Sequence, residues 1–373
     1  MRVGLDARAL ASDEISGVEQ YVTNLVLALS RLEDAPEIVA YTDRPVPDAA
    51  LAEAASSGPI RTQVLQAPRG WLRAALPWRL WRDHVDLVHL PSTIIPPILP
   101  CPAVVTVHDL AWVRYPETYT PADLAMQRHA VLAASERAAH IMTVSESTAR
   151  DLRKYYQKSE GKITVTPLGV SPHFSPEGRQ LSPDAFPGAE RLGKGYVLYT
   201  GGIQPRKNLL RLLAAYAKVL AEGPAPPLVL AGGRCPHADE LRTAARKLGV
   251  ERCLIFLGYV PQGRLPALYR SATVFVYPSL YEGFGLPVLE AMASGVPVVT
   301  SSTSAMPEVA DEAALLVDPE SVDRLAWGIS LLLGDRDLRR TMVQKGLARS
   351  REFTWERTAR MTVEVYRLVA GTK

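Results

Sequence analysis

Cysteine is scarce in this chain of 373 residues, and long apolar runs are missing. The three cysteines, Cys101, Cys235 and Cys253, are scattered, so we expect neither a disulfide framework nor a zinc site. No apolar run approaches the roughly 20 residues that a membrane-spanning helix needs. The N-terminus enters a strand directly, without the pattern of a signal peptide. These absences favour a protein of the cytoplasm.

Charge of one sign is also in short supply. The 42 basic and 39 acidic residues leave a net charge of +3, which is small for this length. Such a balance argues against nucleic acid as a partner bound over the whole surface. The hydrophobic fraction of 47% and the charged fraction of 22% are typical of a globular protein, and the length suits two domains.

Short apolar strands alternate with helical patterns in both halves of the chain, which predicts an α/β fold with parallel sheets. The expected strands are 3–5, 37–41, 87–90, 103–107, 141–144, 163–165, 196–199, 228–230, 253–256, 272–277 and 296–300. Residues 171–195, rich in Pro, Gly, Ser and charge, are expected to link the halves. We therefore predict two doubly wound Rossmann-like domains, 1–180 and 190–352, with a cleft between them and ligands at the carboxyl ends of the strands.

Two carboxylates follow the strand expected at 272–277. Glu282 lies in a loop with two glycines, and Glu290 lies about two turns into a helix that Pro287 begins and Gly295 ends. The free N–H groups of that helix N-terminus favour an anionic or polar ligand. A sugar nucleotide suits this pair, because sugar hydroxyls can bind one carboxylate and a ribose the other. The alternative is that both are surface charges.

Two cations follow the first strand of the second half. Within Gly-Gly-Ile-Gln-Pro-Arg-Lys-Asn, Arg206 and Lys207 stand at the start of a helix, which itself attracts anions. Charge-assisted hydrogen bonds contribute about 1.5–3 kcal/mol each, so the pair suits a diphosphate. We expect these cations to face Glu282 and Glu290 in one site. The alternative is a solvated basic turn in which Asn208 caps the helix.

The first half offers weaker candidates. His108 ends the strand 103–107 and precedes Asp109, and by position it faces the predicted cleft. Asp109 either orients the imidazole or contacts an acceptor. Gly17 lies in the first strand-to-helix loop, where a small residue lets the backbone approach a ligand. The alternatives are a hydrogen-bonded histidine at a strand end and an ordinary turn glycine.

Together these motifs resemble those of the retaining glycosyltransferases of family four, which have the GT-B fold. The resemblance rests mainly on the E-x7-E block with its embedded Gly-Phe-Gly-Leu-Pro. It extends from Gly17 through His108 and Arg-Lys-Asn to residues 353–357, and so covers nearly the whole chain. Many members carry an arginine where Gly202 stands here, and we expect Arg206 to take its place.

The resemblance implies a role for each candidate. His108 lies under the donor sugar, Glu282 holds sugar hydroxyls, and Glu290 holds the ribose. The 1–180 domain binds the acceptor, and a last helix at about 355–373 crosses back to it. Residues of the glycine-containing loops complete the donor pocket, namely Gly232, Tyr259, Val260, Gly283, Phe284, Gly285 and Leu286.

The implied reaction is transfer of a hexose from a nucleoside-diphosphate sugar to a hydroxyl of a glycan, glycolipid or small molecule, with retention. The acceptor attacks from the leaving-group side, and its proton passes to the departing phosphate. The Pro-Arg-Lys-Asn form resembles mannosyltransferases of polysaccharide assembly, which favours GDP-mannose over a UDP-sugar. Asp335 and Asp337 are expected to begin a helix rather than bind a metal, so no metal or other cofactor is expected.

Other functions stay open. A sugar phosphorylase or a nucleotide-sugar epimerase shares the fold. A dinucleotide-binding oxidoreductase is disfavoured, because Leu5-Asp-Ala-Arg8 stands where Gly-x-Gly-x-x-Gly is needed. A noncatalytic carbohydrate-binding protein would leave the cations and carboxylates without a use.

One basic and aromatic segment bears on the partner. It runs from Arg69 to Arg82 and contains four arginines and three tryptophans: Arg69, Trp71, Arg73, Trp78, Arg79, Trp81 and Arg82. Such a segment suits peripheral contact with a membrane that holds a lipid-linked acceptor. The alternative is a helix whose tryptophans pack on the sheet.

Overall fold

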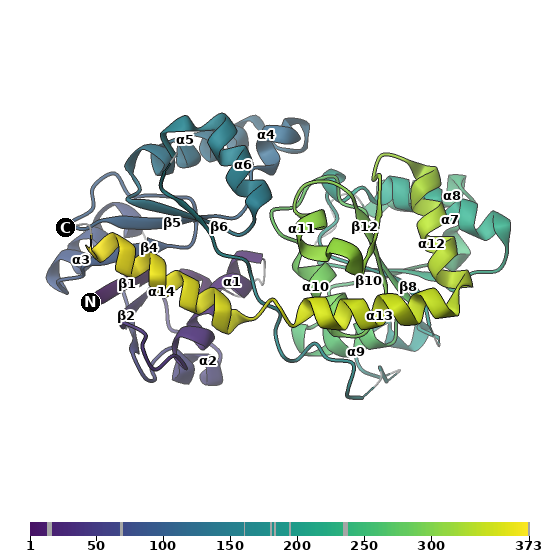
Figure 1. The fold of residues 1–373 in the computed structure, drawn as a ribbon, viewed down its shortest axis with the longest axis horizontal. Coiled ribbons are helices and arrows are strands. Elements are labelled where there is room, and N and C mark those ends of the chain that lie inside the picture. Colours follow the sequence, from purple (N-terminus) through teal and green to yellow (C-terminus); the bar gives the residue numbers. More distant parts are fainter. Residues whose placement is uncertain are drawn as a thin grey trace. The chain divides into compact units, whose positions relative to one another are not determined.

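The computed structural model describes residues 1–12, 17–67, 70–159, 161–179, 181–182, 184–193, 195–233 and 238–371. They form two compact units: Met1–Gly169 with Phe353–Lys373, and Val170–Glu352. Each unit is built on one parallel sheet with helices on both faces (Figure 1). This confirms the predicted α/β class with two doubly wound domains.

The first unit contains a seven-stranded sheet in the order β3-β2-β1-β4-β5-β6-β7. Its strands are β1 (Arg2–Asp6), β2 (Glu37–Thr42), β3 (Ile60–Val64), β4 (Leu87–Leu90), β5 (Ala103–Val107), β6 (His140–Thr143) and β7 (Ile163–Val165). The strand order reverses between β1 and β4, which is where such sheets bind ligands. The edge strand β3 is absent from the expected set, because the residues between its two apolar ends are polar.

Helices cover both faces of the first sheet. They are α1 (Gly17–Leu29), α2 (Ala49–Ala54), α3 (Leu76–Arg82), α4 (Ala111–Arg114), α5 (Pro121–Arg137), α6 (Glu146–Tyr155) and α14 (Trp355–Gly371). Val105 and Val107 of β5 share one apolar core with Leu80 of α3 and Val131 of α5. Thr106 between them points to the opposite face, where α1 and α14 pack.

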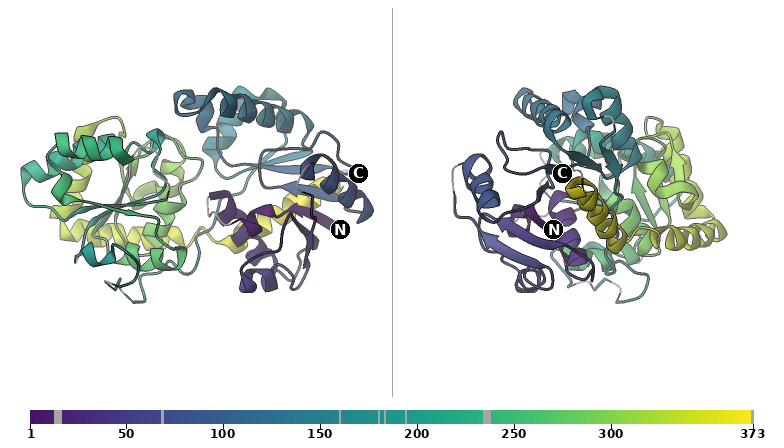
Figure 2. Two further views of the ribbon diagram at one scale, coloured as in Figure 1. Left: turned by 180° about the vertical axis from the view of Figure 1, so that it is seen from behind. Right: turned by 60° about the vertical axis from the view of Figure 1, so that its left-hand side comes forward.

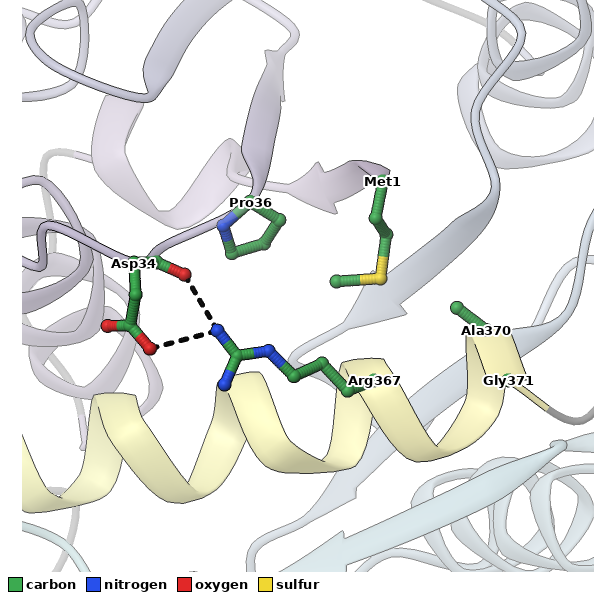
Figure 3. Close-up of a pocket in the computed structure, with 6 residues that line it drawn as sticks. All are labelled: Met1, Asp34, Pro36, Arg367, Ala370 and Gly371. Carbon is green, nitrogen blue, oxygen red and sulfur yellow. Dashed lines mark hydrogen bonds and ion pairs between the residues drawn. The ribbon is translucent and has the colours of Figure 1, made fainter.

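The last helix, α14, lies beside α1 and β4 and completes the first unit (Figure 2). At its start the backbone of Gly169 packs on it, since a Cβ on Gly169 would lie 2.1 Å from the amide nitrogen of Trp355. Near its end, Arg367 donates to the carboxylate and the backbone carbonyl of Asp34, each at 2.9 Å (Figure 3). A hollow of about 450 Å³ adjoins this pair.

The second unit contains a six-stranded sheet in the order β10-β9-β8-β11-β12-β13. Its strands are β8 (Val197–Thr200), β9 (Leu228–Ala231), β10 (Leu254–Gly258), β11 (Val274–Tyr277), β12 (Val298–Ser301) and β13 (Leu315–Val317). Its helices are α7 (Leu209–Glu222), α8 (Ala238–Lys247), α9 (Leu265–Arg270), α10 (Leu286–Ala293), α11 (Met306–Ala310), α12 (Val322–Gly334) and α13 (Arg336–Ser350). The strand order reverses between β8 and β11, so the site that this sheet offers lies beyond their carboxyl ends.

The segment expected to be a linker, 171–195, belongs to the second unit in its described parts. Its side chains Phe174 and Phe186 are buried, and the ring of Phe174 packs edge-on against Tyr269, with 5.7 Å between the centroids. Burial of these rings explains why a stretch rich in proline and glycine is held against the sheet domain. The chain first crosses between the units at Gly169 and returns at Phe353.

Candidate active site

Arg206, Lys207 and Glu282 form an ion triad where the second sheet reverses its order. The cations lie in the 3-10 turn Pro205–Lys207 after β8, and the carboxylate lies in the loop after β11. Lys207 Nζ is 2.6 Å from Glu282 Oε1, and Arg206 Nη1 is 3.1 Å from Oε2. All three side chains are nearly buried, with exposures of 14%, 10% and 9%.

Further hydrogen bonds fix both cations. Lys207 Nζ donates to the hydroxyl of Tyr277 at 2.9 Å, and Arg206 Nη1 donates to the carbonyl of Tyr281 at 3.1 Å. The carbonyl of Arg206 in turn accepts from the amide of Leu280 at 2.8 Å. This segment is therefore not a solvated basic turn.

Asn208 does not cap α7 with its side chain. Its backbone is left-handed, with φ of 65°, and its Nδ2 donates to the carbonyls of Pro278 and Pro319 at 3.0 and 2.7 Å. Asparagine tolerates this conformation better than most residues. The residue thus ties the β8 loop to the β11 loop and keeps the triad together.

Glu282 is ionised in this setting. Burial alone raises the pKa of its carboxyl, but the charges of Lys207 and Arg206 and the hydrogen bond from Lys207 outweigh that effect and lower the pKa to about 2. Two cations and one carboxylate leave a net charge of +1 in a nearly buried position. Such a fixed positive site stabilises negative charge on a ligand or leaving group.

The loop from Glu282 to α10 is held in an unusual backbone conformation. Gly285 has φ of 109°, and a Cβ there would lie 2.3 Å from Met306 Cε. Phe284 is buried, and Leu286 begins α10 with Pro287 in its first turn, as predicted. Pro287 has no N–H group, and the amide of Val288 donates to the carbonyl of Gly285 at 2.9 Å. The amide of Glu282 itself donates to Ser304 Oγ at 3.0 Å.

The carboxylate of Glu290 is hydrogen-bonded to a tyrosine. It is buried on α10, and its Oε2 accepts from the hydroxyl of Tyr269 at 2.9 Å. Tyr269 also contacts Thr200 Oγ1 at the end of β8. Burial raises the pKa of Glu290 to about 7, although the Tyr269 hydrogen bond lowers it in part. Arg206 and Lys207 thus pair with Glu282, whereas Glu290 pairs with a tyrosine. That all four side chains serve one site stays a prediction.

Glycines close the carboxyl edge of the second sheet. The amide of Gly232 donates to the carbonyl of Gly258 at 2.8 Å, and a Cβ on Gly232 would lie 1.9 Å from the carbonyl oxygen of Gly201. Beyond Gly258, Tyr259 is 63% exposed while Val260 is buried. Arg234, which follows Gly232 and Gly233 in sequence, lies outside the described residues.

In the first unit, His108 follows β5 and is partly buried. Its Nε2 lies 2.7 Å from the carbonyl oxygen of Pro91. Because a carbonyl can only accept, Nε2 carries the proton and the neutral ring has its lone pair on Nδ1. Burial lowers the pKa of His108 despite that hydrogen bond and the nearby carboxylate of Asp109. Asp109 Oδ1 accepts from the amide of Ala111 at 3.0 Å.

A polar hollow of about 300 Å³ adjoins the point where the first sheet reverses. Its charged lining residues are Asp6, Arg8, Glu19, Asp43 and Arg44. Gly17 begins α1 nearby, and a Cβ on it would meet nothing within 4 Å. No steric demand in the described residues therefore explains a glycine at this position.

The basic and aromatic segment divides into two parts. Trp71 is buried, with the guanidinium of Arg8 4.3 Å from the centre of its ring. Trp78 and Trp81 on α3 are 54% and 65% exposed. Trp71 therefore fits the packing alternative, whereas Trp78 and Trp81 do not, and Arg69 lies outside the described residues. None of the described helices has the length and apolar character to span a bilayer.

Three residues around the candidate site are missing from the sequence-based set. Tyr269, Tyr277 and Ser304 bond to Glu290, Lys207 and Glu282. Tyr277 stands at the carboxyl end of a predicted strand, which is a usable signal. Tyr269 ends a short helix, and Ser304 follows a strand in a left-handed conformation, so neither has a sequence pattern of its own.

Both halves of the chain match models of glycosyltransferase families. The Glycosyltransferase Family 4 model matches residues 15–174, and the model for Glycosyl transferases group 1 matches residues 183–349. The O-antigen chain mannosyltransferase B of Escherichia coli is 36% identical over 295 residues, which are 78% of this chain and 77% of that protein. A D-inositol 3-phosphate glycosyltransferase of Segniliparus rotundus is 28% identical, with 95% of this chain and 85% of that protein covered.

Solved structures share the fold. Sucrose-phosphate synthase from Thermosynechococcus elongatus has a TM-score of 0.76 at 22% identity, with both chains fully covered. The Anabaena protein HepE in complex with UDP and glucose has a TM-score of 0.71 at 20% identity, with 98% of this chain and 99% of that chain covered. With these relatives and this architecture, the chain belongs to the glycosyltransferases of family four and has the GT-B fold.

Proposed function

We propose that this glycosyltransferase moves a hexose from a nucleoside-diphosphate sugar to a hydroxyl of a glycan, a glycolipid or a small molecule. The observation that carries the proposal is the ion triad of Arg206, Lys207 and Glu282 beside the N-terminus of α10. A diphosphate needs a compact positive site, and a sugar needs a fixed carboxylate that accepts from its hydroxyls. The triad supplies both from adjacent loops.

The cations take the charge of the departing diphosphate. The residual charge of +1 is available for this without a metal ion. The acceptor oxygen forms its bond to the anomeric carbon on the face from which the diphosphate leaves, so configuration is retained. The bond from that carbon to the phosphate oxygen breaks with its electron pair, and the acceptor proton passes to the same oxygen.

The candidate residues have separate roles in binding the donor and the acceptor. Glu282 accepts from sugar hydroxyls, and His108 offers its Nδ1 lone pair to another hydroxyl of the donor sugar. Glu290 accepts from the ribose, and the backbone from Gly283 to Leu286 lines the diphosphate. Gly232, Tyr259 and Val260 line the pocket for the base, and Gly17 and Asp109 serve the acceptor side. No cofactor takes part.

GDP-mannose is the favoured donor. Support comes from the relative in Escherichia coli, which is named as a mannosyltransferase and is 36% identical over 78% of this chain. A UDP-sugar is the second choice, since HepE, which is similar in fold, was solved in complex with UDP and glucose. The acceptor is then a growing polysaccharide or a lipid-linked precursor, handled at the inner face of the membrane in the cytoplasm.

A thermal-shift panel tests the donor. GDP, UDP, ADP and their mannose and glucose conjugates are each added to the whole protein, because a ligand of the native state raises its melting temperature. We expect GDP-mannose to give the largest shift, and Lys207→Met to abolish it. Transfer is then followed by NMR of the product anomeric proton, with and without EDTA. Absence of any shift contradicts a nucleotide-sugar donor, and a product of inverted configuration contradicts retention. Loss of transfer with EDTA contradicts independence from metal ions.

We also propose that the chain contacts a membrane through the α3 patch, defined as Trp78, Trp81 and Arg82 of α3 together with Arg73 of the turn before it. All four are exposed, and the guanidinium of Arg82 lies 5.3 Å from the ring centre of Trp78. Exposed tryptophans beside arginines suit the interface of a bilayer with anionic lipids. Their exposure removes the alternative in which these two tryptophans pack on the sheet.

Vesicle co-sedimentation tests the α3 patch. We expect binding to anionic vesicles that weakens at high salt, and its loss when Trp78 and Trp81 are both changed to alanine. Trp327→Ala is the matched control, because Trp327 is also exposed, at 43%, and lies under Arg324 in the second unit. Equal binding by the double variant, or equal loss in the control, rejects the membrane role of this patch.

A further inference from the structure

The ring of Tyr21 on α1 packs against the imidazole of His108. The rings meet edge-on, with 5.0 Å between centroids and 78° between planes, and Tyr21 is fully buried. We propose that Tyr21 is a positioning residue for His108, and that helix α14 holds Tyr21 in place. The inference rests on the proposed function, in which His108 contacts the donor sugar.

The imidazole of His108 is confined from two directions. The Pro91 carbonyl holds Nε2 at 2.7 Å, which fixes the tautomer and one edge of the ring. The Tyr21 ring lies against it, which limits rotation of the imidazole about its own side-chain bonds. With both contacts, the Nδ1 lone pair has a single direction. If the Tyr21 ring is removed, the Pro91 hydrogen bond alone must hold the imidazole.

Tyr21 is itself held by β5. Its hydroxyl lies 3.3 Å from Oγ1 of Thr106 on β5, two residues before His108. Thr106 Oγ1 also lies 2.8 Å from Nε2 of His89 on β4. These three side chains share the face of the sheet that α1 and α14 cover, away from the apolar core of α3, α5 and α6.

Helix α14 reaches this group at two points. The hydroxyl of Tyr366 lies 2.7 Å from Nδ1 of His89, and the ring of Trp355 lies 6.3 Å from that of Tyr21, centroid to centroid. Tyr366 is fully buried. Helix α14 thus contacts Tyr21 directly through Trp355 and indirectly through the hydrogen bonds of His89 and Thr106.

Every member of this chain of contacts is neutral. Burial lowers the pKa of His89 to about 3, so its ring stays uncharged at neutral pH. A buried neutral histidine with both nitrogens bonded is costly to rearrange, since any rotation leaves a polar atom without a partner. The arrangement therefore fixes geometry, and it does not carry charge to His108.

NMR of the unliganded whole protein tests the positioning directly. Ring nitrogen shifts of His108, assigned with His108→Asn, should show a single tautomer with the proton on Nε2. We expect Tyr21→Leu to give mixed ring states and to lower kcat by about 10- to 100-fold, because small displacements of a positioned group have effects of that size. Tyr21→Phe keeps the ring and should restore both readouts. Tyr366→Phe should give an intermediate result.

Tyr41→Phe is the matched control. Tyr41 is a fully buried tyrosine of the same unit, and its hydroxyl donates to the carboxylate of Asp83 at 2.8 Å rather than to the strand that carries Thr106. We expect this variant to melt at a lower temperature with unchanged His108 signals and kcat. Unchanged signals and kcat in Tyr21→Leu overturn the proposal. If His108→Asn leaves transfer intact, the proposed role of His108 fails, while the tautomer measurement still decides the positioning.

Discussion

Lys207 and Glu282 come from loops after different strands, yet Lys207 Nζ lies 2.6 Å from Glu282 Oε1. The two strands, β8 and β11, are neighbours in the sheet although about 75 residues separate the two side chains. The pair is buried, so each charge depends on the other for compensation. Lys207, which we propose binds the leaving diphosphate, therefore also stabilises the fold of the site through Glu282.

A double-mutant cycle measures this dependence. We expect Glu282→Gln alone to lower the free energy of unfolding by about 3–5 kcal/mol, because two buried cations lose their counter-charge. The Glu282→Gln, Lys207→Met double variant should recover part of that loss, with a coupling of about 0.5–3 kcal/mol in urea unfolding. The exposed pair Glu356 and Arg360, at 2.9 Å, is the control and should show coupling near zero. Equal couplings contradict the assignment.

Binding of the donor should depend on pH through Glu290. Its pKa of about 7 means that the carboxyl ionises as pH rises from 6 to 8, and an ionised carboxylate accepts more strongly from a ribose hydroxyl. GDP-mannose, whose diphosphate does not titrate in this range, should therefore bind more tightly as pH rises, by calorimetry. Tyr269→Phe should move the midpoint upward, because that hydrogen bond favours the charged form. A flat profile for the unmodified protein contradicts this role.

The raised pKa of Glu290 also makes the free energy of unfolding depend on pH. Between the ordinary carboxyl pKa of 4.5 and about 7, the native state binds more protons at Glu290 than the unfolded state does. The free energy of unfolding should therefore fall as pH rises through this window. Glu290→Gln should lose this component, which denaturant unfolding at pH 5 and pH 8 can detect. An identical change with pH in both proteins would disprove the buried titration.

Two neighbouring glycines should respond differently to alanine. A Cβ on Gly232 would lie 1.9 Å from the Gly201 carbonyl oxygen, so Gly232→Ala should force the edge of the sheet apart and cost about 1–3 kcal/mol. Gly202→Ala is the control, because a Cβ there meets nothing within 4 Å, and it should change stability by less than about 0.5 kcal/mol. Chemical denaturation of the two variants decides between these expectations, and equal losses refute the packing argument.

The tryptophans of the basic segment should separate in the same way. Trp71→Ala removes a buried ring that packs with Arg8, so it should lower the free energy of unfolding by about 3–5 kcal/mol. Trp81→Ala removes a ring that is 65% exposed and should change stability by less than about 0.5 kcal/mol. Similar unfolding curves for the two variants would contradict the division of this segment.

Much of the architecture could be predicted from the sequence because the central strands are buried on both faces and therefore apolar throughout. The edge strands β3 and β13 were beyond that pattern, since one is polar in its middle and the other spans only Leu315–Val317. Asp335 caps α13 by accepting from the amide of Leu338, as its place before a helix predicts.

The pairing inside the candidate site was harder to predict. The motif identifies Glu282 and Glu290 as a pair, but their partners come from other strands and helices. Which cation reaches which carboxylate depends on loops held by Asn208 in a left-handed conformation, and sequence patterns do not specify that geometry. Strand-end positions were thus predictable, whereas contacts between strand ends were not.

The return of α14 makes the first unit discontinuous in sequence, with consequences for the nascent chain. The ribosome makes every residue of Val170–Glu352 before it makes α14. Domains fold as units during synthesis, so the later-made half can finish folding while the earlier one still waits for Trp355 and Tyr366. Tyr21 and His108 can therefore reach their final arrangement only after α14 has been made.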